Sequence, residues 1–362
     1  MSSFPTRRPA LRPHVRVDAE EPMSRGRQRA EQLGEQLHGA LAIYEEFFRL
    51  GGVRMEQVRT DAPRALADIC DYAPALGDEI RGIAEVANLE QWQVAALNTR
   101  TEILARSAST GPGECSTILR ESPAGVFGVQ TWDWHVELAG SWHTQQVIGG
   151  RYHVVGLTEH GILGKIGINS AGLGLHFNIL GHRDDSVGGI PMHVLSAHVL
   201  QNAGSVAEAI DLVRSAPIRS SGSFALLDPQ GSALLEITPH GVFEVPQLHP
   251  GIHLRTNHFL TEAPKAAEKT WLYQPDSSQR FDFLSARLAQ KAPNSTQELF
   301  ENLITGDGEP PVTCVPDMGL AMGQRWASLA TIILDPATCS ARILDGTPAE
   351  GTHRPWRTLI AN

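Results

Sequence analysis

The amino-acid sequence predicts an α+β fold in which helices cover the outer faces of antiparallel sheets. Apolar residues recur at helical spacing through the first hundred residues, whereas short strands separated by glycine begin near residue 115. From there on, runs of strands and runs of helices follow one another without strict β-α-β alternation. This arrangement favours layered antiparallel sheets over a doubly wound parallel sheet.

Three helical patterns precede residue 106. The first runs from Ser24 to Leu50, where apolar side chains keep helical spacing until Gly51-Gly52 ends the run. The second covers roughly Ala62–Ala87 and is interrupted by Pro74, and the third covers Glu90–Ala105. The first hundred residues are therefore expected to be mostly helical.

The strand-rich part follows a loop of small polar residues, Gly and Pro at residues 107–114. Helical patterns return at four places: Pro191–Ala203, Val206–Ala216, Ser277–Gln290 and Thr296–Thr305. The strands Ala327–Leu334 and Ala341–Leu344 are expected to form a hairpin across Asp335-Pro336.

The chain is expected to form one unit from residue 23 to residue 362, because it contains no internal repeat, low-complexity tract or long linker. Residues 1–22 are rich in proline and arginine and have little periodic pattern. They are expected to form a flexible N-terminal arm.

Composition narrows the class of function. The 362 residues carry a net charge of −10 without a Lys/Arg cluster, which argues against nucleic acid and anionic membrane surfaces as partners. No segment has the ~20 apolar residues of a membrane span, and no secretory leader is recognised at the N-terminus. The expectation is a cytoplasmic enzyme.

Metal and redox motifs are absent from the sequence. The four cysteines are widely scattered and form no C-x-x-C pair. The histidines, such as His193 and His198, do not fit H-E-x-x-H, so no metal ligands are expected.

Three polar residues stand out at strand ends. Cys115 follows the exposed loop directly and lies outside any apolar run, which favours a reactive thiol over a structurally buried one. Asp133, in Gln-Thr-Trp-Asp-Trp-His, either caps a turn or orients an amine or a thiol. Asn257, in Arg-Thr-Asn-His-Phe, is either a turn residue or an oxyanion donor.

Together these segments resemble a known family. The sequence has Cys115 after a loop, Asp133 in Gln-x-Trp-Asp-Trp, the turn Gly-Ile-Asn-Ser-Ala-Gly-Leu at 167–173, Thr-Asn-His-Phe around Asn257, and a late Arg325 before a small-residue strand. In this order they resemble the acyl-coenzyme A:6-aminopenicillanic-acid acyltransferases, the C45 peptidase family of N-terminal-nucleophile hydrolases. The resemblance covers about residues 30–344 and implies a four-layered αββα fold.

The resemblance also implies that the chain cuts itself between Glu114 and Cys115. The products would be an α fragment of residues 1–114 and a β fragment of residues 115–362, which stay associated. Cleavage gives the cysteine an α-amino group with a pKa near 8, and this amine can act as general base for its own thiol. The penicillin-forming enzyme has glycine where this chain has the bulkier Glu114.

The resemblance assigns four catalytic roles. Cys115 matches the nucleophile, Asp133 the carboxylate that orients the amino terminus, and Asn257 the oxyanion donor. Arg325 matches an arginine near the nucleophile, which stabilises charge or binds a substrate carboxylate.

Three more residues are candidates for lining the substrate site. The backbone N–H of Trp134 or His135 would complete the oxyanion site, and Asn169 would have a structural or site-lining role. The tryptophans Trp132, Trp134 and Trp142 either line an acyl pocket or belong to the core.

The function implied is that of a self-processing cysteine amidohydrolase or acyltransferase. It would act on a small acylated amine, amino acid or peptide, with no cofactor and with a coenzyme A thioester as a candidate acyl donor. Two alternatives stay open: a papain-like cysteine hydrolase, and a catalytically silent, uncleaved binding protein of the same fold.

Overall fold

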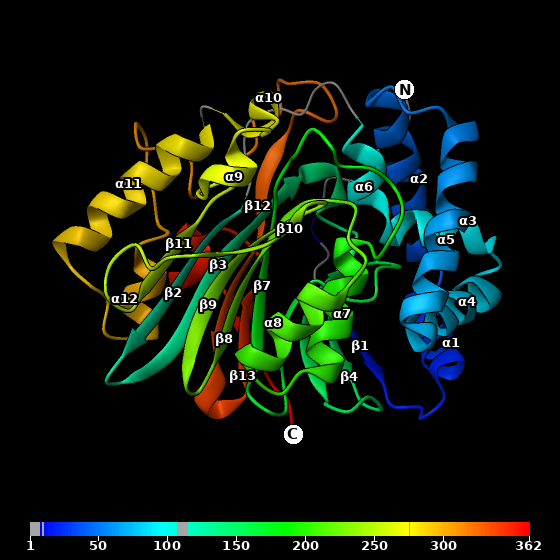
Figure 1. Ribbon diagram of the computed structural model, residues 1–362, viewed down its shortest axis with the longest axis horizontal. Helices are drawn as coiled ribbons and strands as arrows, with labels where there is room; N and C mark the ends of the chain where they lie inside the picture. The colour runs from blue at the N-terminus through cyan, green and yellow to red at the C-terminus, as the bar shows by residue number, and fades with distance from the viewer. Residues whose placement is uncertain (1–7, 9–10, 107–114, 275) are drawn as a thin grey trace.

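Two β-sheets form the centre of the protein (Figure 1). The computed structural model describes residues 8, 11–106, 115–274 and 276–362. The larger sheet has the strand order β1-β4-β5-β6-β7-β8-β9-β10, and the smaller has the order β11-β2-β3-β12-β13-β14. Strand β3 contacts β7 and β8, and β2 contacts β9, so the two sheets pack face to face.

The strands have the following bounds: β1 His14–Val17, β2 Ser116–Ser122, β3 Gly125–His135, β4 Trp142–Val147, β5 Val154–Glu159, β6 Ile166–Asn169, β7 Gly174–Ile179, β8 Gly222–Asp228, β9 Gly231–Thr238, β10 Gly241–Val245, β11 Ile252–Arg255, β12 Trp326–Asp335, β13 Ser340–Leu344 and β14 Trp356–Ile360. Strands β12 and β13 pair as the predicted hairpin, from Thr331 opposite Leu344 to Asp335 opposite Ser340.

The α-helices have the following bounds: α1 Pro22–Leu33, α2 Gln36–Leu50, α3 Met55–Tyr72, α4 Pro74–Ala87, α5 Gln91–Asn98, α6 Arg100–Leu104, α7 Met192–Asn202, α8 Val206–Ser215, α9 Glu262–Lys265, α10 Thr270–Tyr273, α11 Asp276–Gln290 and α12 Thr296–Glu301. A short 3₁₀ helix, η1, follows β3 at Val136–Leu138.

Helices cover the outer face of each sheet. Helices α7 and α8 contact the larger sheet, whereas α11 and α12 contact the smaller one. Two apolar cores result. One lies between the smaller sheet and helices α11 and α12, and the other joins the two sheets with α1–α8. The layering is α-β-β-α, which confirms the predicted α+β class and four-layered architecture.

The N-terminal helices are shorter than the sequence pattern predicts. The run expected over residues 24–50 is divided at Gly34, whose φ of +52° breaks the helical backbone between α1 and α2. Helices α3 and α4 meet at Ala73, just before Pro74. Figure 1 shows these helices, in blue and cyan, gathered on one side of the sheets.

The predicted flexible arm is wrong for the end of its range. Strand β1 pairs in parallel with β4, and its Val15 and Val17 are buried. The Arg12 guanidinium lies 3.7 Å from the centre of the Trp142 ring and hydrogen-bonds Asp345. Four residues of alternation are too few to stand out in a proline- and arginine-rich stretch, so the sequence pattern missed the strand.

Strand alternation decides which side chains of β2 and β3 reach which layer. Ile118 and Val129 belong to the core under α11 and α12, whereas Leu119 and Trp132 belong to the core between the sheets. Asp133 therefore shares the α11 face with Val129. Among the described helices, none is both long and apolar enough to cross a membrane.

Candidate active site

Cys115 lies directly before β2, an inner strand of the smaller sheet. Its side chain is 4 % exposed, and its thiol donates to the backbone oxygen of Asp133 at 3.8 Å. Its own carbonyl oxygen accepts from Asn178 Nδ2 at 2.9 Å and from Arg280 Nη1 at 3.1 Å. Both the thiol and the carbonyl group are thus held in place.

Asp133 lies on β3, with Ser328 opposite it on β12. It is fully buried, and Thr131 donates a hydrogen bond to its Oδ2 at 3.4 Å. No described residue donates a hydrogen bond to its Oδ1. Burial raises the pKa of Asp133 to about 7, although the nearby Ser328 hydroxyl and the charge of Arg280 act in the opposite direction.

Asn257 follows β11 and is also buried. Its side-chain nitrogen donates to Ile179 O at 3.0 Å, and its Oδ1 accepts from Arg280 Nη2 at 3.2 Å. Because arginine only donates, this contact fixes which end of the amide faces which way. The structure thus brings Cys115, Asp133 and Asn257 into one cluster, as expected.

Arg280 joins the members of this cluster, and the sequence interpretation missed it. Its Nη1 contacts both Cys115 O and Ser116 Oγ, the latter at 2.8 Å, while its Nε contacts Asp276 at 2.7 Å. It lies on α11 in line with Leu284 and Leu288, which are core residues. The sequence could have indicated this role, because Arg280 stands at the same helical spacing as the apolar residues that face the core.

Arg325 occupies a different place. Its Nε donates to Leu320 O at 2.6 Å, and its Nη1 lies 3.6 Å from Glu137. It precedes Ser328, the partner of Asp133, by three residues, which is about 10 Å along a strand. The described contacts of Arg325 do not include Cys115, and Arg280 holds the position expected for it.

Asn169 is a turn residue, and its described hydrogen bonds do not include Cys115, Asp133 or Asn257. It ends β6, and its side-chain nitrogen donates to Leu200 O and Ala203 O. Its side-chain oxygen accepts from the backbone of Ala171 and Leu173. Its amide is thereby saturated, and it shapes the predicted turn between β6 and β7.

A cavity of about 330 Å³ lies next to this cluster. Two of the residues that contact Cys115, namely Asp133 and Asn178, are each followed in the chain by a residue that lines the cavity. Trp134 and His135, two of the three expected substrate-binding residues, line it together with Ile179, whose carbonyl holds Asn257. Phe47 and Leu104 add apolar wall. Burial lowers the pKa of His135 to about 3, so the ring is neutral near pH 7.

Three buried charges lie behind the tryptophans of β3. Lys165 Nζ is 2.7 Å from Glu159 and 4.3 Å from the centre of the Trp132 ring, and Arg100 also pairs with Glu159. The Arg100 guanidinium lies 4.4 Å from the centre of the Trp134 ring. Burial lowers the pKa of Lys165 to about 8, although Glu159 and Cys115 act in the opposite direction.

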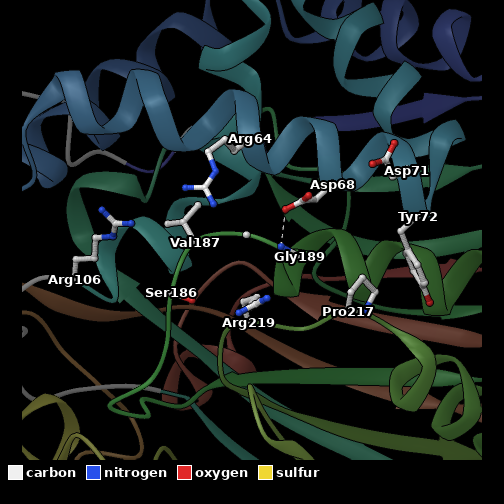
Figure 2. A pocket seen from close by; sticks show the side chains of 11 residues that line it. Arg64, Asp68, Asp71, Tyr72, Arg106, Ser186, Val187, Gly189, Pro217 and Arg219 are labelled. Atoms are coloured by element: carbon white, nitrogen blue, oxygen red, sulfur yellow. Dashed lines mark hydrogen bonds between the residues drawn. The ribbon is translucent and has the colours of Figure 1, made fainter.

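A polar cleft of about 780 Å³ lies between α3 and the loops that carry residues 186–189 and 217–219 (Figure 2). Arg64 of α3 and Arg219 on the facing loop line it, and Asp68 accepts a hydrogen bond from Gly189 N at 2.7 Å. In each of three segments, one residue lines the cavity and the residue next to it lines the cleft. These pairs are Ala105 and Arg106, Asp185 and Ser186, and Ser220 and Arg219. The two spaces share the wall that these segments form.

The fold and the site define the class of protein: a four-layered αββα protein in which a buried cysteine directly precedes an inner strand of one sheet. A family model described as acyl-coenzyme A:6-aminopenicillanic acid acyl-transferase matches residues 120–350. The chain belongs to this family.

Individual proteins similar to this chain include one known sequence and two solved structures. The 40 kDa form of acyl-coenzyme A:6-aminopenicillanic-acid-acyltransferase from Emericella nidulans is 28% identical over 290 residues, which cover 79% of this chain and 78% of that protein. A penicillin V acylase from Agrobacterium tumefaciens has a TM-score of 0.40 and 13% identity over 68% of this chain and 86% of its own. A Caenorhabditis elegans N-acylethanolamine-hydrolyzing acid amidase ortholog has a TM-score of 0.43 and 12% identity over 68% of this chain and 100% of its own.

Proposed function

We propose that the protein is a self-processing cysteine amidohydrolase or acyltransferase that works through an acyl-Cys115 intermediate. The observation that carries the proposal is the position of Cys115. It directly precedes an inner strand, contacts Asp133 and has its carbonyl held by Arg280. Its partners Asp133 and Asn178 are followed in the chain by Trp134 and Ile179, which line a largely apolar cavity. The E. nidulans relative, named as an acyltransferase, supports the same chemistry.

Self-processing creates the nucleophile. The Cys115 thiol adds to the carbonyl carbon of Glu114, the C–N bond breaks, and the amine of Cys115 is released. Water then hydrolyses the thioester, leaving a carboxylate on Glu114 and a free thiol. Glu114 lies outside the described residues. Cys115, which would carry the new amine, and Asp133, which would bind it, are both described.

Asp133 is the proposed partner of that amine. Its buried Oδ1 lacks a donor among the described residues, and an unpaired buried carboxylate oxygen is costly. A neighbouring α-ammonium group would supply the donor and would lower the carboxyl pKa. The carboxylate would in turn orient the amine as base for the thiol.

In each turnover the amine accepts the thiol proton, and the sulfur attacks the acyl carbon of the substrate. The Asn257 amide and the backbone N–H of Trp134 or His135 are the proposed oxyanion donors. Arg280 is a positioning residue: it holds Asn257 Oδ1, so the donor end of the amide faces away from the guanidinium. The leaving amine takes the proton, and water or a second amine then accepts the acyl group.

The cavity beside Cys115 is proposed to hold the acyl group. Its volume and its lining by Phe47, Leu104 and Trp134 suit an apolar chain or ring of modest size. The candidate substrates are acylated amines, acylated amino acids, penicillins and, as acyl donors, coenzyme A thioesters.

A substrate panel tests the proposal. The wild-type chain and Cys115→Ser are incubated with acyl-amines, acyl-amino acids, a penicillin and an acyl thioester, and quenched samples are weighed by mass spectrometry. We expect product release and a transient acyl adduct on the peptide that begins at Cys115, both absent from Cys115→Ser. Equal turnover by the two proteins, or an adduct elsewhere, contradicts the proposal, and binding without turnover favours a silent binding protein.

A further inference from the structure

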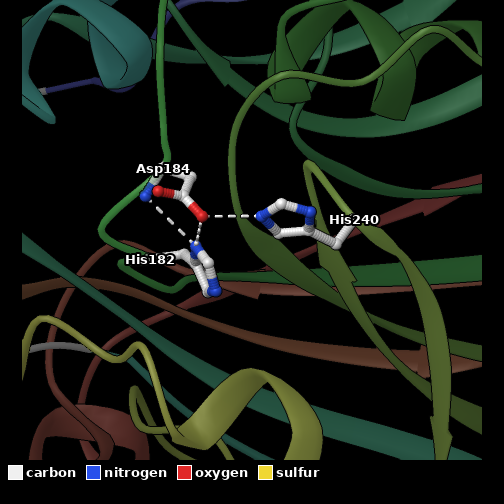
Figure 3. A group of neighbouring side chains, drawn as sticks. All are labelled: His182, Asp184 and His240. Carbon is white, nitrogen blue, oxygen red and sulfur yellow. Dashed lines mark hydrogen bonds and ion pairs between the residues drawn. The ribbon is translucent and has the colours of Figure 1, made fainter.

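A second cluster of side chains lies on the outside of the cavity wall and has no role in the proposed reaction. His182 and Asp184 come from the loop after β7, and His240 from the turn between β9 and β10 (Figure 3). Among the described residues this is the only group of three or more His, Cys, Asp or Glu whose ligand atoms all lie within 4.8 Å of one another.

We propose that His182, Asp184 and His240 bind a divalent transition-metal ion of the zinc type. Two imidazole nitrogens and one carboxylate oxygen, with a fourth position for water, are a common zinc donor set. The proposal is independent of the reaction at Cys115.

The distances between the ligand atoms suit such an ion. Asp184 Oδ2 is 2.6 Å from His240 Nε2 and 3.7 Å from His182 Nδ1. A tetrahedral zinc ion with bonds of ~2.0–2.1 Å places its ligand atoms roughly 3.4 Å apart. Binding therefore requires the contact between Asp184 and His240 to open by less than about 1 Å, and both of these side chains are exposed enough to move.

Both segments hold the backbone of their histidines in place. His182 is 3 % exposed, and its backbone bridges to Glu268. The Asp184 N–H donates to His182 Nδ1 at 3.2 Å, so this nitrogen presents a lone pair, which the ion would take over. The His240 N–H donates to Thr238 Oγ1 at 3.1 Å within the tight β9–β10 turn.

Lys269, a neighbouring cation, is directed elsewhere. The Lys269 ammonium donates to Ala105 O at 2.8 Å and lies 3.9 Å from Asp185 Oδ2. It therefore faces Asp185 and the end of α6. A metal ion at the cluster does not have to displace it.

The proposed site connects to the cavity through Asp185. This residue lines the cavity, accepts from Ser221 Oγ at 2.6 Å and accepts from the His182 backbone N–H at 2.7 Å. An ion on His182 and Asp184 would tie this part of the wall to the β9–β10 turn. We expect the ion to stiffen this part of the wall.

The test is zinc binding to the Cys115→Ser chain, which lacks the reactive thiol as a competing ligand. Calorimetric titration with Zn²⁺ is expected to give one ion per chain and a higher melting temperature in zinc. His240→Ala and Asp184→Asn should each weaken binding by roughly 100-fold or more and remove the melting shift. His353→Ala, which removes an exposed histidine outside the cluster, is the matched control and should bind as the parent does.

Cobalt substitution identifies the donors. Tetrahedral nitrogen and oxygen ligands should give visible d–d bands without the charge-transfer band of a thiolate. Unchanged zinc affinity in both His240→Ala and Asp184→Asn would overturn the proposal, as would a thiolate band in the cobalt spectrum. His240 is exposed, so its variant is expected to fold, and its melting temperature without metal checks this.

Discussion

Arg280 and Arg325 differ in what their guanidinium groups contact. Arg280 is fully buried and joins Cys115, Ser116 and Asn257. The side chain of Arg325 is 25% exposed and contacts Glu137 and a backbone carbonyl. The planar guanidinium group of Arg280 hydrogen-bonds Cys115 O, Ser116 Oγ and Asn257 Oδ1 at the same time. A lysine ammonium group cannot reproduce that geometry.

Replacing Arg280 by lysine is therefore expected to reduce kcat/KM by ~100-fold, because misplacing a reacting group by about 1 Å has a cost of that order. The matched variant Arg325→Lys should stay within a few-fold of wild type. Steady-state kinetics on both variants measure the difference. A larger loss in Arg325→Lys than in Arg280→Lys would show that Arg325, and not Arg280, is the arginine that the reaction needs.

Asp133 makes folding stability depend on pH in a chain that lacks the free amine. Burial raises its pKa to about 7 in the folded state, whereas an unfolded aspartate titrates near 3.9. A raised folded-state pKa contributes stability below the unfolded value, and that stability is lost as the pH rises through about 7.

The free energy of unfolding of Cys115→Ala should therefore fall between pH 4 and pH 7 by on the order of 4 kcal/mol relative to Cys115→Ala with Asp133→Asn. Urea unfolding across this range measures the difference. A flat difference would mean that Asp133 titrates normally and is not primed for an amine.

At the scale of elements, α1 and α4 pack through glycines. A Cβ atom on Gly26 would lie 2.1 Å from Glu79 O, and one on Gly82 would lie 2.1 Å from Met23 O. Both obstacles are backbone atoms, which cannot rotate away as the end of a side chain can. The two helices can approach this closely only because glycine stands at both positions.

Gly82→Ala should accordingly destabilise the protein by roughly 1–3 kcal/mol, the usual cost of overpacking. Gly39→Ala on α2 is the control, because a Cβ there meets nothing within 4 Å. It should be neutral or stabilising by up to about 1 kcal/mol. Thermal or urea unfolding separates the two, and equal effects would contradict the close helix contact.

Local patterns predicted the longer elements but not the short ones. The hairpin across Asp335 and the paired helices of residues 277–305 were visible, because periodicity over many residues is a strong signal. Strand β1 depends on β4, a partner more than a hundred residues away, and four alternating residues do not encode that pairing. The break at Gly34 was also missed, because glycine is tolerated inside many helices.

The candidate site was predictable only in part for the same reason. Cys115, Asp133 and Asn257 stand at strand ends in distinctive local sequences, and the structure brings them together. Arg280 reaches Cys115 from a helix 165 residues further along the chain, by packing of α11 on the sheet. Such a contact is set by tertiary structure, and a motif search does not find it.

At the scale of the whole molecule, the two proposed fragments share one structure. Residues 1–114 supply α1–α6 and β1, and β1 pairs with β4 of the other fragment. Arg100 of the first fragment forms a buried ion pair with Glu159 of the second, and Arg12 covers Trp142. Side chains from both fragments make up the larger core. Separating the fragments would expose this core, so we expect them to stay together after cleavage.

The central claim is that Cys115 becomes an N-terminal nucleophile, and intact-mass analysis of the purified protein tests it most directly. Wild-type protein should elute as one species under native conditions and give two masses under denaturing conditions, for residues 1–114 and 115–362. Cys115→Ala should give one mass, that of the uncut chain of 362 residues. A wild-type protein that stays full length and whose Cys115 does not react with iodoacetamide would contradict the account.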